Sequence, residues 1–259
     1  MATGNGEKII YFHYEHKATQ RKGNCILCDS MGNKSYMKMF KRFMYFIVLL
    51  VVVFISYVYF VNLNSKNMTI RQKLLKSFYP LVMAFGGAKA KSFSKSDIAP
   101  VVSFYSLKAI ANNGTEFDFA QLKGKKVLLV NTASNCGFTN QYDDLQQLHE
   151  KFQNKLVIIG FPANDFKEQE KGNDDDIAQF CKINFGVTFL LMKKSSVVKS
   201  TEQNSVFKWL SDSKFNGWSN KQPSWNFSKY LISEAGELIH YFDPAVSPLS
   251  NEVISAIEQ

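Results

Sequence analysis

Apolar and polar residues alternate in short blocks through the second half of the chain, and these blocks predict alternating strands and helices. The runs at residues 127–131 and 156–162 are short and apolar, which is typical of buried strands. A segment with apolar residues at helical spacing follows the first run, to about residue 154, and a segment opened by three aspartates follows the second. Acidic side chains at a helix start are favoured by the helix dipole. The pattern is completed by hairpins turning at Asn113-Gly114 and Gly236, a short helix at residues 206–212, and a closing helix capped by Ser250 or Asn251. We therefore predict an α/β sandwich.

The longest apolar block, residues 43–63, carries no charge over 21 positions, which is long enough to cross a bilayer as a helix. Tyrosines lie toward its ends, where amphipathic rings favour the headgroup boundary. A buried core helix rarely stays uncharged for so long, and no small-residue cleavage site follows as after a signal peptide. We expect an uncleaved membrane anchor. Its boundaries divide the chain into a basic tail (1–42), a transmembrane helix (43–63), a juxtamembrane segment and linker (64–97), and a globular domain (98–259).

The net charge of +9 is distributed unevenly along the chain. Residues 1–96 hold 15 Lys/Arg and 3 Asp/Glu, whereas residues 97–259 hold 16 Lys/Arg and 19 Asp/Glu. The basic charge therefore belongs to the N-terminal part, and the globular part is mildly acidic. Nucleic-acid binding by the globular part is not expected.

The N-terminal region carries two further features. Cys25 and Cys28 have the spacing of a redox motif or half a zinc site, but no second pair accompanies them, and we interpret them as incidental cysteines of a polar tail. The sequence from Met68 has a basic start, an apolar middle and a small-residue motif at residues 88–90. A lysine and a proline interrupt that middle, so a second translation start at Met68 stays an open alternative.

The stretch "NTASNCGFT" at residues 131–139 places one cysteine, Cys136, where a predicted strand turns into a predicted helix. Unpaired backbone N–H groups and a partial positive charge near a helix start favour the thiolate and lower the thiol pKa. Ser134, Asn135 and Gly137 keep the turn small enough for a ligand to approach. A structural, buried cysteine is the alternative, and the position alone leaves both interpretations open.

Three stretches, "NTASNCGFT", "FPANDFKEQEKG" and "WNFSKYL", occur in this order, and together they resemble the glutathione peroxidase family. The resemblance extends from about Val101 to Ile257. It implies a thioredoxin-like fold that reduces hydroperoxides with a cysteine or selenocysteine, without a metal or organic cofactor.

Carried over by this resemblance, the peroxidatic residue is Cys136, and the family's glutamine, tryptophan and asparagine fall on Gln169, Trp225 and Asn226. The residue types suit the chemistry. A thiolate that attacks an O–O bond needs its charge held, and amide and indole N–H groups do this without titrating.

Departures from the family pattern shape the remaining expectations. Cys181 lies in the helix where many members carry a resolving cysteine, but one residue earlier, so it is either a resolving or a packing residue. Ala163 stands where many relatives have cysteine. The loop and helix used for tetramer contacts in some animal members are missing between Trp209 and Trp225. The resemblance therefore implies a monomeric catalytic domain with an open site that accepts bulky lipid hydroperoxides.

We predict a membrane-anchored thiol peroxidase that acts in the response to oxidative stress. It would reduce hydrogen peroxide and organic or lipid hydroperoxides through a sulfenic acid on Cys136. Glutathione or a thioredoxin-type protein would restore the thiol, directly or through Cys181. The alternative is a membrane-anchored, thioredoxin-like binding domain with little peroxidase activity. The short basic N-terminal tail favours a peroxidase domain on the extracytoplasmic side, although equal basic clusters flank the span and leave the reverse orientation open.

Overall fold

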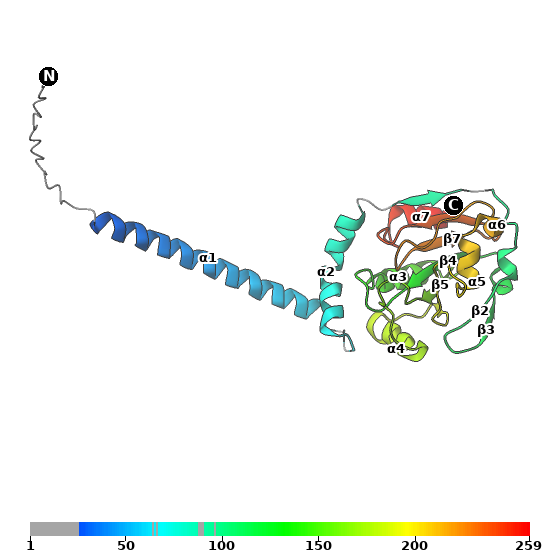
Figure 1. Cartoon of the computed structure of the whole chain (residues 1–259), viewed down its shortest axis with the longest axis horizontal. Helices are drawn as coiled ribbons and strands as arrows, with labels where there is room; N and C mark the ends of the chain where they lie inside the picture. The colour runs from blue at the N-terminus through cyan, green and yellow to red at the C-terminus, as the bar shows by residue number, and fades with distance from the viewer. Residues whose placement is uncertain (1–25, 64, 66, 88–90, 96) are drawn as a thin grey trace, which may run out of the picture. The chain divides into compact units, whose positions relative to one another are not determined.

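The computed structural model describes residues 26–63, 65, 67–87, 91–95 and 97–259, and the chain divides after Val53 into two units. Figure 1 labels the elements along the chain. The helices are α1 (Ile26–Val61), α2 (Ile70–Gly87), α3 (Gln141–Phe152), α4 (Asp174–Phe185), α5 (Ser205–Leu210), α6 (Ser213–Asn216) and α7 (Asn251–Glu258), with 3-10 turns at Phe104–Ser106 and Phe119–Leu122. The strands are β1 (Ser92–Ser94), β2 (Lys108–Ile110), β3 (Glu116–Asp118), β4 (Lys126–Thr132), β5 (Leu156–Pro162), β6 (Leu190–Leu191), β7 (Lys229–Ile232) and β8 (Leu238–Phe242).

One six-stranded sheet, in the order β1-β8-β7-β4-β5-β6, organises the second unit. Strand β5 runs parallel to β4 and β6, whereas β7 is antiparallel to β4 and β8, and β1 is antiparallel to β8. Strands β2 and β3 form a separate hairpin. Parallel strands joined through α3, followed by an antiparallel hairpin and a closing helix, form a thioredoxin-like α/β fold, as the sequence predicted.

Both faces of the central strands are buried, which explains why the sequence of β4 is apolar without alternation. Leu128 and Val130 belong to the core shared with α3, α4 and α7. Val127 and Leu129 point to the opposite core, shared with α5 and the 3-10 turns, because successive side chains of a strand face opposite sides. The two α-helical runs predicted after β4 and β5 are confirmed as α3 and α4.

Local signals at the turns and caps are confirmed. Gly114 and Gly236 adopt φ of +85° in the two hairpin turns, a conformation that glycine tolerates without steric cost. The Asn173 side chain caps α4 by accepting from the Asp176 N–H. Ser250 caps α7 by accepting from the Val253 N–H, which decides between the two residues expected there.

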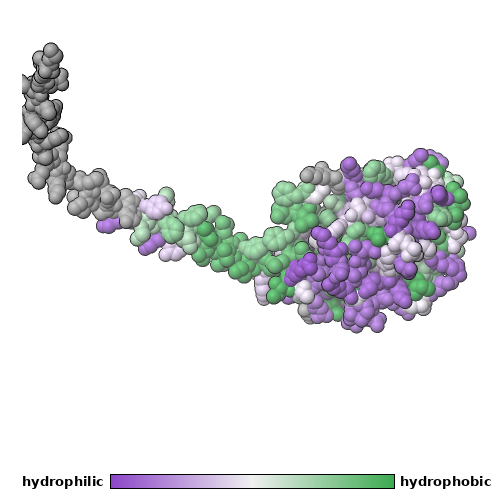
Figure 2. All heavy atoms as spheres, viewed as in Figure 1, coloured by the Kyte–Doolittle hydropathy of each residue, from purple (hydrophilic) through white to green (hydrophobic). Residues whose placement is uncertain are grey.

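The N-terminal half differs from the expectation in its boundaries. Helix α1 begins at Ile26, inside the predicted tail, and its residues 34–61 are long and apolar enough to cross a membrane by length and composition, the criterion that a signal sequence also meets. None of its most apolar window is buried, and apolar surface follows the helix in Figure 2. The predicted linker contains β1, which pairs with β8. The juxtamembrane segment contains α2, an element that the sequence analysis did not predict.

Helix α2 packs on the α/β domain within the same unit. The Tyr79 hydroxyl donates to the Asp144 carboxylate on α3 at 2.5 Å, and Met68, just before α2, is 7% exposed within the core of α3 and α4. Five apolar side chains of α2 instead remain exposed at helical spacing: Ile70, Leu74, Phe78, Leu81 and Phe85. The helix thus has one face on the domain and one apolar face that the domain does not cover.

Candidate active site

Cys136 lies in the turn between the carboxyl end of β4 and the start of α3. Its own N–H donates to the Thr139 hydroxyl oxygen at 2.9 Å, and that hydroxyl donates to the Ala133 carbonyl oxygen at 2.8 Å. The Phe138 N–H points at the Cys136 Sγ at 3.4 Å. The turn therefore fixes the sulfur and directs backbone donors toward it, from Phe138 and Gly137.

The expected environment of Cys136 is wrong in one respect, because the thiol is buried. The side chain is 1% exposed, and this burial raises its pKa above the ordinary value of 9.0. Donors from Phe138, Trp225 and Asn226 oppose the rise without reversing it. Helix α3 begins only at Gln141, five residues later, so the helix start does not provide the expected lowering of the pKa.

The four residues expected at the site come together from distant parts of the chain. Trp225 and Asn226, from the loop before β7, lie close enough to the Cys136 thiol to lower its pKa. The Asn226 Nδ2 donates to the Gln169 Oε1 at 3.0 Å, and the Gln169 carbonyl oxygen accepts from the Asn135 N–H at 3.0 Å. The amides of Gln169 and Asn226 are therefore joined beside the turn that carries the cysteine.

Asn131, at the end of β4, holds the Trp225 loop in place and was not singled out from the sequence. Its Nδ2 donates to the Trp225 carbonyl oxygen, and its Oδ1 accepts from the Ser228 N–H, both at 3.0 Å. Its own carbonyl oxygen accepts from the Phe227 N–H. The sequence offers a weak signal, a polar residue closing an apolar strand.

Glu170 is a second residue that sequence reasoning missed. It is 1% exposed, and its Oε2 accepts from both the N–H and the hydroxyl of Ser134, at 2.8 and 3.0 Å. Burial raises the pKa of this carboxyl from 4.5 to about 7, although the Ser134 donors act in the opposite direction. Glu170 thereby connects the Gln169 loop to the cysteine turn.

The open site that the sequence predicted is not observed, because α2 covers the cysteine. The Gln72 Nε2 on α2 donates to the Ser134 carbonyl oxygen at 2.9 Å. Met68, Leu75 and Lys76 line a small cavity together with Cys136. The absence of the tetramer loop between Trp209 and Trp225 therefore does not leave Cys136 exposed in this chain.

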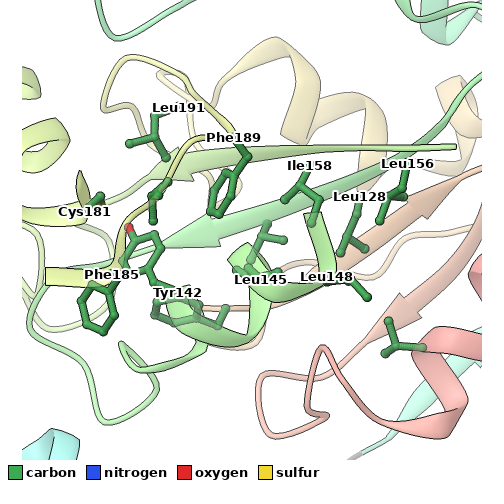
Figure 3. Close-up of a cluster of buried hydrophobic side chains, with 14 of the residues drawn as sticks. Leu128, Tyr142, Leu145, Leu148, Leu156, Ile158, Cys181, Phe185, Phe189 and Leu191 are labelled. Carbon is green, nitrogen blue, oxygen red and sulfur yellow. The ribbon is translucent and has the colours of Figure 1, made fainter. Parts of the chain in front are cut away.

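Cys181 lies in α4, fully buried in the same core as Cys136, and both cysteines are free. Figure 3 shows the Tyr142 hydroxyl pointing toward Cys181 among apolar side chains. Burial raises the pKa of the Cys181 thiol to about 12. Of the N-terminal pair, Cys25 lies outside the described residues, and Cys28 lies in α1.

The fold and the site together indicate a thiol-based peroxidase. The domain is thioredoxin-like, its cysteine follows the first central strand, and neutral N–H donors face that cysteine. The family model "Glutathione peroxidase" matches residues 104–211. The chain is 44% identical over 149 residues to glutathione peroxidase-like peroxiredoxin 2 of Saccharomyces cerevisiae, covering 57% of this chain and 91% of that one. It is 41% identical over 147 residues to the glutathione peroxidase homolog BsaA of Staphylococcus epidermidis, covering 56% and 92%. A crystal structure of Trgpx in apo form is 33% identical, covering 61% of this chain and 97% of that one, with a TM-score of 0.47.

The relatives from S. cerevisiae and S. epidermidis establish the identity at the level of the family. The chain belongs to the glutathione peroxidase family, and it is a peroxidase.

Proposed function

We propose that Cys136 is the nucleophile that reduces hydrogen peroxide and organic or lipid hydroperoxides. The observation that carries this proposal is the placement of Trp225 and Asn226 at the Cys136 thiol, with Gln169 hydrogen-bonded to Asn226. The thiolate attacks the nearer peroxide oxygen, the O–O bond breaks, and the sulfur becomes a sulfenic acid. The other oxygen takes up a proton and leaves as water or an alcohol.

The neutral donors suit this reaction because they stabilise negative charge without carrying a titrating proton. The indole N–H of Trp225 and the amide of Asn226 are directed to the sulfur, so they favour the thiolate that burial disfavours. Gln169 accepts from the Asn226 amide and thereby orients it. Trp225→Phe and Gln169→Ala should therefore slow the oxidation of Cys136 while leaving the fold intact.

The reductant is a thiol, for which glutathione and a thioredoxin-type protein are the two candidates. A first thiol condenses with the sulfenic acid and releases water, and a second thiol displaces the sulfur and leaves a disulfide. The S. cerevisiae relative is named a peroxiredoxin, which favours a thioredoxin-type reductant. Comparing turnover with glutathione and with a thioredoxin system at equal thiol concentration distinguishes the two.

Cys181 is the candidate for the first of these thiols. Its raised pKa and its position inside α4 make it a poor nucleophile in the folded helix, because the thiolate is the attacking species. Resolution by Cys181 therefore requires α4 to unwind locally. Mass spectrometry after one equivalent of peroxide tests this: a Cys136–Cys181 disulfide supports the proposal, whereas a lasting sulfenic acid with reduced Cys181 contradicts it.

The competing function is a thioredoxin-like binding domain with little activity. The full chain in detergent, mixed with peroxide and a thiol, tests the two against each other. We expect peroxide consumption that Cys136→Ser abolishes, because a serine hydroxyl is not ionised near neutral pH. Cys28→Ser is the control for the loss of a cysteine, because Cys28 lies in α1, outside the site. Wild-type consumption by Cys136→Ser would overturn the assignment of the nucleophile.

We also propose that α1 anchors the enzyme in a membrane. Its apolar stretch supports this proposal, and so does the exposed apolar stripe of α2. The end of α1 that belongs to the second unit contacts α2, because the Phe54 and Phe78 rings lie 5.7 Å apart and the Tyr57 hydroxyl donates to the Ser77 carbonyl oxygen. A peroxidase held this way would lie beside the lipids that peroxides damage. Recovery of the chain in the alkali-washed membrane pellet is expected, and release into the supernatant would contradict the anchor.

A further inference from the structure

Helix α2 precedes the residues that match the family model, yet it contributes side chains to the surroundings of Cys136. Met68 and Gln72 line the small cavity that contains the cysteine. Lys76, one turn further along α2, lies 5.5 Å from the ring of Phe185 at the end of α4. The cysteine is thus enclosed between the α/β domain and a segment that precedes the residues matched by the family model.

The cavity beside Cys136 is very small. Its volume is about 10 Å³, near the minimum of about 10–15 Å³ that holds one water molecule. Hydrogen peroxide exceeds water by one oxygen atom, so a slight adjustment of the surrounding side chains admits it. An alkyl hydroperoxide carries a carbon chain beside its O–O bond, for which this cavity has no space.

A much larger pocket lies next to the small cavity. It has a volume of about 380 Å³ and is lined by Gln169, Glu170 and residues of α4. Gln72 and Ser134 line both spaces, and the hydrogen bond from the Gln72 amide to the Ser134 carbonyl oxygen closes the boundary between them. Displacement of Gln72 would join the space at Cys136 to the larger pocket.

We propose that Met68 and Gln72 determine which hydroperoxides reach Cys136. In the closed structure they exclude organic hydroperoxides and leave hydrogen peroxide as the accessible substrate. Outward movement of the first turns of α2 opens the route from the larger pocket and admits bulky hydroperoxides. This inference rests on the proposed role of Cys136 as the nucleophile.

Polar and apolar contacts together hold α2 on the domain, and the bond at Gln72 is the one that closes the boundary between the two spaces. The Gln72 and Tyr79 side chains each make one hydrogen bond to the domain, to Ser134 and Asp144. The Gln72 side chain is only partly buried, and its Oε1 is already held by the Thr69 N–H and hydroxyl. Breaking the bond to Ser134 therefore leaves Gln72 with local partners.

The test compares two peroxides on the full chain in detergent. Gln72→Ala and Met68→Ala should raise the ratio of kcat/KM for cumene hydroperoxide over hydrogen peroxide by about fivefold or more. Tyr79→Phe, which releases α2 without touching the cavity, should raise the same ratio. Ile70→Ala is the matched control, because Ile70 is 79% exposed on the same helix, and it should leave the ratio unchanged.

A second readout separates this inference from the proposed function. Alkylation of Cys136 by a bulky maleimide, followed by mass spectrometry, reports access whether or not the residue is the nucleophile. The rate of alkylation by the bulky maleimide is divided by the rate with a small alkylating agent. A higher ratio in Gln72→Ala supports the inference that α2 restricts access to Cys136, even if Cys136→Ser retains activity. Unchanged peroxide ratios and unchanged alkylation in both Gln72→Ala and Tyr79→Phe, with the fold of each variant checked by circular dichroism, would overturn the inference.

Discussion

The side-chain amide of Asn131 donates a hydrogen bond to the carbonyl oxygen of Trp225 at 3.0 Å. These residues lie 94 positions apart, so the bond fastens the loop before β7 to the end of the central strand that leads to Cys136. The same side chain accepts from the Ser228 N–H. Asn131 therefore positions Trp225, and none of its hydrogen bonds described above involves the Cys136 thiol.

Replacement of Asn131 should consequently affect both stability and chemistry. Asn131→Ala leaves the buried Ser228 N–H without its partner and leaves the Trp225 carbonyl oxygen with the Ser228 hydroxyl alone. We expect the free energy of unfolding to fall by about 2 kcal/mol. The rate of Cys136 oxidation by hydrogen peroxide should fall as well, because Trp225 loses its fixed position. Urea denaturation and stopped-flow oxidation measure the two effects. Exposed Asn154 provides the control, Asn154→Ala, and equal behaviour of the two variants would contradict this role.

The buried thiol of Cys136 predicts a specific pH dependence of its reactivity. Because burial raises its pKa above 9.0, the thiolate fraction should still increase about tenfold per pH unit between pH 7 and pH 8.5. Alkylation by iodoacetamide, quantified on the Cys136 peptide, measures this directly. Cys181, whose pKa is raised to about 12, should react more slowly throughout. A plateau of Cys136 alkylation below pH 8 would show that the donors outweigh burial.

Glu170 predicts a pH dependence of stability. Its pKa is about 7 in the folded chain against an ordinary value of 4.5, so the folded state binds the proton more tightly between these values. The contribution of Glu170 to the free energy of unfolding therefore decreases as pH rises from 4.5 to 7, by about 3 kcal/mol in total. Glu170→Gln should be more favourable relative to wild type at pH 8 than at pH 4.5 by that amount. Parallel stability curves from urea unfolding would contradict the prediction.

The orientation in the membrane is a further prediction, with the N-terminal tail in the cytoplasm and the peroxidase domain outside. Cys136 and Cys181 are buried and therefore serve poorly as reporters. A cysteine at the exposed position Glu202 (Glu202→Cys) is a better one. A membrane-impermeant maleimide applied to intact cells should label this residue, whereas Cys25 and Cys28 should be labelled only after lysis. The opposite pattern would reverse the topology.

The parts of the fold that the sequence predicts correctly are those decided by local pattern. Strands β4 and β5 are read from uninterrupted apolar runs, and the turn at Gly236 from a glycine between two such runs, since burial on both faces and φ above zero leave direct marks in the sequence. The packing of α2 on Cys136 leaves no such mark. Gln72 meets Ser134 across 62 residues, and nothing local to either residue indicates the other.

The raised pKa of Cys136 cannot be predicted from the local sequence for the same reason. The turn and the neutral side chains of Gln169, Trp225 and Asn226 are visible as residue types, and these all favour the thiolate. The opposing effect is desolvation, which depends on atoms that reach the thiol from other elements, α2 among them. Burial of a single side chain is a property of the assembled core and not of the segment that carries it.

Strand β1 determines where a fragment that contains the catalytic domain has to begin. It pairs with β8 at the edge of the sheet through Ser92, Phe93 and Ser94, and the Lys95 N–H adds a bond to the Ile239 carbonyl oxygen. A fragment that starts at residue 98 would lose this strand together with α2. Its β8 would then present unpaired backbone groups, which recruit strands from other molecules. Such a fragment would self-associate in solution, and its oligomers would be an artefact of where the gene was cut.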